Sequence, residues 1–138
     1  MSLEVCIMLP EEVICKTSTE EVIIPTSTGQ LGIKEGHTRM VSALDIGIIR
    51  FKVGEKWVAF ITPNKGAAVI KNNNVLIFLK KIESIPKQDY EKAKNDVALA
   101  YEKVLQNNET KSKTKKSEDG ANLKLLRARL VGLKYVDE

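Results

Sequence analysis

The pattern of apolar residues changes at Ile85-Pro86, and this change limits the possible folds more than any other feature of the chain. Before it, apolar and polar residues alternate as in β-strands; after it, apolar residues recur every three or four positions, as in amphipathic helices. We therefore expect a β domain over residues 1–85 and a helical region over residues 86–138. With 138 residues in all, the first region must supply most of the core.

Short β-rich runs separated by turn residues fill the first region. Along 46–53, Ile49, Phe51 and Val53 share one face of a strand. Gly54-Glu55 and the asparagines at 72–74 tolerate positive φ and predict two hairpins. The other predicted strands are residues 3–9, 12–16, 21–24, 57–61, 67–71 and 75–81. Because an open sheet of so many strands would leave adhesive edges, a β sandwich or flattened barrel is favoured.

The second region predicts a pair of helices. One apolar stripe at helical spacing comprises Tyr90, Ala93, Val97, Tyr101 and Val104. Ala93 and Ala98 should let the helices pack closely. A second stripe comprises Leu123, Leu126, Leu130 and Leu133. Between them, residues 107–120 contain no apolar residue and four lysines, which predicts a mobile, basic connector at about 107–120. The expected result is a helical hairpin that buries little area of its own and can detach.

The sequence carries no convincing catalytic or cofactor motif. His37 is the only histidine, so a histidine metal site is excluded and a turn role is expected for that ring. The spacing of Gly29, Gly32 and Gly36 matches no phosphate-binding loop. Cys6 and Cys15 form no C-x-x-C pair and indicate neither a zinc site nor a disulfide framework. We expect a protein that is not an enzyme and has no metal or cofactor.

Charge and hydropathy narrow the choice of partners. The formal net charge is +4, and the excess of basic residues lies late in the chain, which suggests an acidic partner for that end, although simple solubility would also explain it. No stretch approaches the ~20 apolar residues that a membrane-spanning helix needs, and the N-terminus lacks a secretory signal. We expect no membrane span.

The order of several short motifs resembles the epsilon subunit of rotary ATP synthases, especially the plastid-encoded ones. Thr28-Gly29-Gln30-Leu31-Gly32-Ile33 is followed by Gly36-His37 and then by Ser42-Ala43-Leu44-Asp45-Ile46-Gly47. The first eight residues resemble that group's start, and Leu123 with Arg127-Ala128-Arg129 resembles its second helix. The resemblance spans the whole chain and implies an N-terminal β sandwich with a C-terminal two-helix hairpin.

The resemblance implies a non-catalytic subunit of the central stalk. The sandwich would bind the gamma subunit and the c-ring and couple proton-driven rotation to ATP synthesis. The helices would restrain ATP hydrolysis by contacting the alpha/beta catalytic head. The location implied is the stromal side of the thylakoid membrane, reached through the complex, or the cytoplasmic side of the inner membrane if the source is bacterial.

Specific residues follow from the resemblance. The expected partner interface comprises Gly29, Gln30, Leu31, His37 and Arg39. The expected contacts of the regulatory helix comprise Lys124, Leu126, Arg127, Arg129 and Leu130. Some bacterial relatives bind ATP through a motif with an aspartate where this chain has Lys124, so no nucleotide is expected here. The family's usual Gly-Gly-Phe is replaced at residues 65–68, and its His-Ala-Pro-Leu at residues 37–40, which places details of the stalk contact in question.

A second hypothesis is a basic oligonucleotide-binding β-barrel. It would need several exposed aromatic rings on one sheet for base stacking. The aromatic residues of the predicted strands, all expected to point into the core, are Phe51, Trp57, Phe60 and Phe78. No nucleic-acid partner is therefore expected.

Overall fold

The computed structural model describes residues 2–86, 88–110 and 113–135. The chain divides into two compact units, Met1–Ser84 and Ile85–Glu138, one residue before the break in the sequence pattern.

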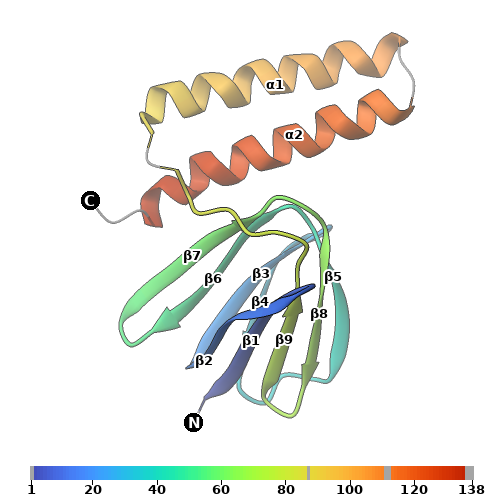
Figure 1. Cartoon of the computed structure of the whole chain (residues 1–138). Coiled ribbons are helices and arrows are strands. Elements are labelled where there is room, and N and C mark those ends of the chain that lie inside the picture. The colour runs from blue at the N-terminus through green and yellow to red at the C-terminus, as the bar shows by residue number, and fades with distance from the viewer. Residues whose placement is uncertain (1, 87, 111–112, 136–138) are drawn as a thin grey trace. The chain divides into compact units, whose positions relative to one another are not determined.

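The first unit is a β sandwich, which confirms the predicted fold class (Figure 1). A five-stranded sheet has the order β2-β1-β9-β8-β5 and a four-stranded sheet the order β4-β3-β6-β7. The strands are β1 (Leu3–Leu9), β2 (Glu12–Thr19), β3 (Glu21–Thr26), β4 (Gly29–Lys34), β5 (Met40–Leu44), β6 (Gly47–Val53), β7 (Lys56–Thr62), β8 (Gly66–Lys71) and β9 (Asn74–Phe78).

The core lies between the two sheets. Alternate residues of β1 point inward, so that Leu3, Val5 and Ile7 are fully buried while Glu4 is exposed. β1 pairs in parallel with β9 and places Val5 beside Val75. The opposite sheet contributes fully buried residues in the same way; these include Val22, Ile24, Ile33, Ile49 and Phe51.

Two hairpins form where the sequence predicts them. β6 and β7 pair antiparallel around a turn in which Gly54 has φ +66°. β8 and β9 pair antiparallel around a turn in which Asn72 and Asn73 have φ +50° and +61°. Glycine and asparagine are the residues that adopt these angles at least cost, which is why the local sequence locates both turns.

The observed strands differ from the predicted ones in several places. β4 and β5, which lie at the edges of their sheets, were not predicted. β2 continues through Thr19 rather than ending at Lys16, and β3 continues through Thr26 rather than ending at Ile24. The prediction for β9 was too long, because that strand ends at Phe78 rather than at Lys81. β4 contains Gly29 and Gly32, and glycine has a low strand propensity. β4 pairs with β3 in a hairpin closed at Thr26 and Gly29, which sets Ile33 beside Val22.

The second unit is a helical hairpin of α1 (Tyr90–Thr110) and α2 (Lys113–Gly132), followed by a 3-10 turn, η1 (Leu133–Tyr135). The most buried positions of the helices are small or branched residues: Ala93, Ala100, Leu123, Ala128 and Gly132. The predicted stripe was wrong in part, because Tyr90 and Tyr101 are 57% and 47% exposed. Ala100, not the exposed Ala98, is the second small residue at the contact, since it lies seven positions after Ala93 and so on the same face.

The predicted connector at about 107–120 was wrong for most of its length. α1 continues to Thr110 and α2 begins at Lys113, so only residues 111–112 of the predicted connector lie outside the described helices. A run without apolar residues can still be helical when it extends a packed helix, because lysine, glutamate and glutamine have good helix propensities.

Candidate partner interface

The first predicted contact, at Gly29–Leu31, is the start of β4 after a polar turn. The Thr26 hydroxyl donates a hydrogen bond of 2.6 Å to the Gly29 carbonyl. Gly29 has φ +127°, an angle that side chains disfavour, and a Cβ there would meet no atom within 4 Å. The glycine is therefore required by the backbone conformation of the turn, and its surroundings are open.

The two residues after Gly29 point in opposite directions. Gln30 is exposed, and its side-chain oxygen accepts a hydrogen bond of 3.0 Å from Arg50 Nη2. Leu31 is half-buried and packs against the hydrophobic core. Only Gly29 and Gln30 of this group present a surface to a partner.

His37 and Arg39 follow the other end of β4. The His37 backbone N–H donates to the Lys34 carbonyl at 3.1 Å, which closes a turn in which Gly36 has φ +81°. His37 Nδ1 lies 2.8 Å from the Thr38 carbonyl oxygen and must carry the proton, since a carbonyl only accepts. His37 is half-buried beside a shallow hollow of about 270 Å³, and Arg39 is exposed.

The structure does not bring the predicted interface residues together. Gly29 begins β4 and His37 follows its end, so the six residues of the strand, roughly 20 Å, separate the two groups. A single contact surface of ordinary size would have to run along the whole edge strand to include both.

The sequence analysis did not predict an apolar face that lies on the outer side of the five-stranded sheet. Strand register places its members in two rows, each crossing the sheet. One row comprises Val13, Met8, Phe78, Ala67 and Ala43, and the other comprises Cys6, Leu76, Val69 and Val41. Three of these side chains are strongly exposed: Val41 (74%), Val13 (57%) and Phe78 (43%). A contiguous exposed apolar surface is typical of a protein contact.

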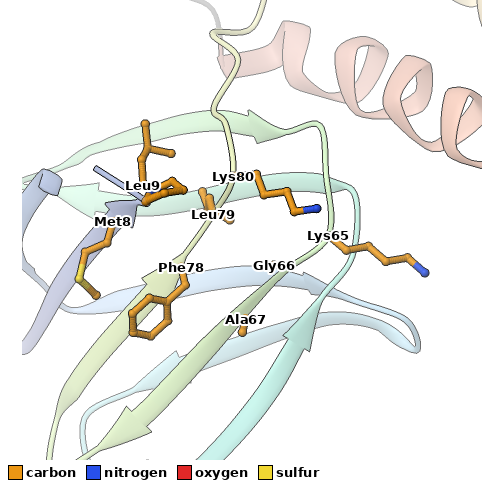
Figure 2. A pocket seen from close by; sticks show the side chains of 9 residues that line it. Met8, Leu9, Lys65, Gly66, Ala67, Phe78, Leu79 and Lys80 are labelled. Atoms are coloured by element: carbon orange, nitrogen blue, oxygen red, sulfur yellow. The ribbon is translucent and has the colours of Figure 1, made fainter. Parts of the chain in front are cut away.

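A cavity of about 370 Å³ opens at one end of this apolar face (Figure 2). Met8 and Phe78 are register partners on one side of it, and Lys65 and Lys80 extend on the other. Gly66 lines the floor, where a Cβ would clash with the Phe78 carbonyl oxygen. The missing side chain therefore lets β8 approach β9.

The cavity and the Gly29 turn lie at the same end of the sandwich. Gly66, at the cavity, pairs with Leu44. The next residue, Asp45, donates its N–H to the Pro25 carbonyl at 3.0 Å, and Pro25 pairs with Gln30. An apolar contact at the cavity and a polar contact at Gln30 are thus available at one end.

The prediction that all four aromatic side chains point inward was wrong for two of them. Phe51 is buried and Phe60 packs against the core, but Phe78 is 43% exposed and Trp57 lies on the outer face of the four-stranded sheet. The sequence did contain a signal that Phe78 points outward. Residues 75–79 are apolar at consecutive positions, and successive side chains of a strand point to opposite faces, so both faces of this strand must be apolar.

The predicted regulatory residues are distributed around α2. Lys124 and Arg127 are exposed and Arg129 is half-buried. Leu126 and Leu130, one helical turn apart, are half-buried. In the closed hairpin Lys124 and Arg127 are exposed, while Arg129 and the two leucines are partly covered.

No three His, Cys, Asp or Glu side chains among the described residues are placed to hold a metal ion. Cys6 and Cys15 are both free thiols, and burial, with a smaller contribution from Cys6, raises the pKa of Cys15. Neither α1 nor α2, as far as each is described, has the length and apolar character of a membrane-spanning helix.

Comparisons with known proteins agree on one family. The model of the ATP synthase Delta/Epsilon chain, beta-sandwich domain, matches residues 2–85. The chain is 32% identical over 136 residues to the chloroplastic ATP synthase epsilon chain of Thalassiosira pseudonana, with 99% of each chain covered. It is 34% identical over 130 residues to the ATP synthase epsilon chain of Acaryochloris marina, with 94% of each covered.

A further relative and a solved structure extend this comparison. The chloroplastic ATP synthase epsilon chain of Pylaiella littoralis is 40% identical over 100 residues, which cover 72% of this chain and 75% of the relative. A chain in the cryo-EM structure of the Euglena gracilis mitochondrial ATP synthase, which contains OSCP, F1 and the c-ring, has a similar fold. The TM-score is 0.75 at 18% identity, with 96% of this chain and 81% of that chain covered.

Proposed function

The chain belongs to the ATP synthase epsilon chain family, and on that premise we propose that it is the non-catalytic epsilon subunit of the central stalk in a plastid ATP synthase. It would transmit proton-driven rotation of the c-ring to the catalytic head. The observation that carries this proposal is the apolar face of the five-stranded sheet, where the exposure of Val41 and Phe78 is typical of a surface that a protein partner covers.

The apolar face is the proposed site of the gamma subunit. An apolar side chain of gamma would enter the cavity beside Phe78, and the lysines at 65 and 80 would lie at the margin of the contact. Burial of apolar surface contributes about 25 cal/mol per Å², so covering this face would provide most of the affinity. The lysines would mainly affect the association rate and its salt dependence.

The Gly29 turn is the proposed contact with the polar loops of the c-ring. Gly29 has space around its Cα, which allows another backbone to approach closely, and Gln30 offers an amide at the surface. Its position at the same end as the cavity would let one end of the sandwich contact both gamma and the c-ring.

The helical hairpin is the proposed restraint on ATP hydrolysis. When it opens, α2 would insert Leu126 and Leu130 between subunits of the alpha/beta head, while Lys124, Arg127 and Arg129 would meet acidic loops there. Exposed ion pairs contribute only about 0–1 kcal/mol each, so the leucines must supply much of the stability of the open state. Because alanine and glycine occupy many of the buried positions, opening the hairpin loses little apolar burial.

Two further features are part of this proposal. The subunit has no catalytic role and binds no nucleotide between its helices, since Lys124 is exposed and cationic where the bacterial motif has an aspartate. It lies at the thylakoid membrane on the stromal side, held there by the complex. The chloroplast origin of several relatives supports this location.

The test uses ATP synthase heads that retain gamma but have been stripped of their own epsilon chain. The full chain and a version ending at Ile85 are each added, and co-sedimentation and ATP hydrolysis are measured. Binding by both, with inhibition only by the full chain, is the expected result. The absence of binding by either would refute the assignment and favour the oligonucleotide-binding hypothesis.

A further inference from the structure

Two cations lie side by side at the edge of the five-stranded sheet, where β5 lies next to β8 (Figure 1). Arg39 directly precedes β5, and Lys71 is the last residue of β8. Met40 pairs with Ile70, and one residue further along the same antiparallel register places Arg39 beside Lys71. Met40 and Ile70 are packed in the core, whereas both cations are exposed. Because successive side chains of a strand alternate between faces, both cations lie on the outer face of the sheet.

The two cations adjoin a strongly exposed part of the apolar face. Val41 follows Arg39 by two residues, and Val69 precedes Lys71 by two. These two valines are register partners, and Val41 is 74% exposed. Two strand residues span about 7 Å, a distance that a long basic side chain can cover. A partner that covers Val41 therefore comes within reach of both cations.

The carboxylates nearest to this pair, in the sheet and in the chain, have other neighbours. In the row of Lys71, Asn74 comes next and Glu4 after it. Glu4 accepts a hydrogen bond from the Ser18 hydroxyl of β2, on the side away from Lys71. Glu35, in the loop before β5, lines the hollow beside β4 on the other sheet. Within the described part of the chain, neither cationic side chain has a hydrogen bond or an ion pair.

Covering the valines changes the electrostatics of the cations beside them. Adjacent cations repel each other weakly in water, and the repulsion grows when a partner displaces part of that water. A carboxylate from the partner offsets both the repulsion and the lost hydration, and the arginine guanidinium can donate two parallel hydrogen bonds to it. A nucleic acid would satisfy the cations but would lay its charged backbone against Val41 and Val69. The surface therefore favours an apolar protein segment that carries a carboxylate at this corner.

We propose that the segment of gamma that covers the apolar face carries an acidic side chain that pairs with Arg39 and Lys71. The inference rests on the proposed function, because it takes gamma as the partner of this face. The cavity lies at Gly66, the first residue of β8, and Lys71 is the last residue of that strand. An apolar contact at the cavity and an ionic contact at Lys71 lie at opposite ends of β8, so together they fix the orientation of gamma on the sheet.

The first experiment measures binding of the full chain to epsilon-depleted heads that retain gamma, at several salt concentrations. Arg39→Gln should weaken binding about three- to tenfold at low salt, and the difference from wild type should shrink as salt screens the ion pair. Lys56→Gln is the matched control, because it removes the same charge from an exposed position of β7 on the other sheet. Equal affinities of the two variants at every salt concentration would overturn the inference. Absence of binding by the wild-type chain would instead refute the proposed function.

A second experiment identifies the carboxylate. The full chain bound to the heads is treated with a carbodiimide, which joins a lysine amine directly to a carboxylate, and the cross-linked peptides are identified by mass spectrometry. The expected product links Lys71 to an acidic residue of gamma and is absent in Lys71→Gln. Linkage of Lys71 only to Glu4 or to a second copy of the chain, or no linkage at all, would overturn the inference.

A charge reversal completes the test. Arg39→Glu should weaken binding more than Arg39→Gln, because it places two carboxylates together. Changing the cross-linked gamma residue to lysine should restore binding of Arg39→Glu, and failure to restore it would count against the pair. The thermal unfolding midpoints of all variants are compared with wild type, so that a loss of structure is recognised.

Discussion

Gly132, the last residue of α2, lies directly against Ile85, the first residue of the same unit. A Cβ built at Gly132 would be 3.0 Å from two carbon atoms of the Ile85 side chain and 3.1 Å from a third. This contact joins the end of the hairpin to the segment that leads into α1. These distances are shorter than ordinary van der Waals contact, so a larger residue at position 132 requires the Ile85 side chain to shift.

Gly132→Val should therefore favour the open hairpin. Overpacking against Ile85 is expected to cost about 1–3 kcal/mol and to speed hydrogen exchange in α1 and α2. If the open hairpin restrains hydrolysis, the variant should also inhibit ATP hydrolysis more strongly than wild type. Gly120→Ala is the control, since a Cβ there meets no atom within 4 Å and alanine favours the helix. Unchanged exchange in Gly132→Val would show that the contact does not hold the hairpin closed.

The apolar face predicts that charge at Val41 disrupts the contact with gamma. Val41 is 74% exposed, so Val41→Asp should leave the unfolding midpoint nearly unchanged. Binding to epsilon-depleted heads should weaken at least tenfold, because the carboxylate would be desolvated in an apolar contact. Val53→Asp changes an exposed valine of β6 and serves as the control. Equal binding by both variants would remove the apolar face from the proposed interface.

Gly66 should not tolerate a side chain. Gly66→Ala places a Cβ against the Phe78 carbonyl and the Leu79 side chain, so β8 must shift from β9, at a cost of about 1–3 kcal/mol. Gly32→Ala meets only the Glu21 carboxylate at 3.7 Å and should be nearly neutral. Denaturant unfolding of the two variants measures the difference. Similar midpoints would mean that the strand pair is less closely packed than described.

Asn73 joins two turns, and its loss should destabilise the sandwich. Its side-chain oxygen accepts the Gly36 N–H at 2.8 Å, and its carbonyl accepts the Glu4 N–H at 2.8 Å. Asn73→Ala removes the first bond and places alanine at φ +61°, which together should cost about 1–3 kcal/mol. Asn72→Gly at φ +50° should be neutral or slightly stabilising. The free energies of unfolding in urea test both, and an unaffected Asn73→Ala would contradict the assigned role.

Cys15 should react slowly with alkylating agents. Burial raises its pKa, so less reactive thiolate is present at a given pH than for an exposed thiol. The native state also keeps this proton longer than the unfolded state, so its contribution to stability is present below the usual thiol pKa and is lost as pH rises through the raised value. Alkylation of a Cys6→Ser variant, with and without denaturant, measures Cys15 alone. Equal rates in the two conditions would show that the thiol is not protected.

Local sequence determined the two-part organisation of this protein. Alternation along β1 and β6, and helical spacing after Pro86, each indicate which side of an element is buried. Glycine at position 54 and asparagine at positions 72 and 73 indicate positive φ. These are properties of neighbouring residues, so they can be read without knowing the fold. The order of short motifs also identified the family, which the comparisons confirm.

Only the tertiary structure decided which surfaces are available for function. The register of β1, β9 and β8 places Met8, Phe78 and Ala67 in one outer row, and the path of β4 separates Gly29 from His37. Pairing between distant segments sets these positions, and a shift of one residue would move every side chain to the other face. The sequence therefore determined the elements, while long-range strand pairing decided which of their apolar and charged residues meet a partner.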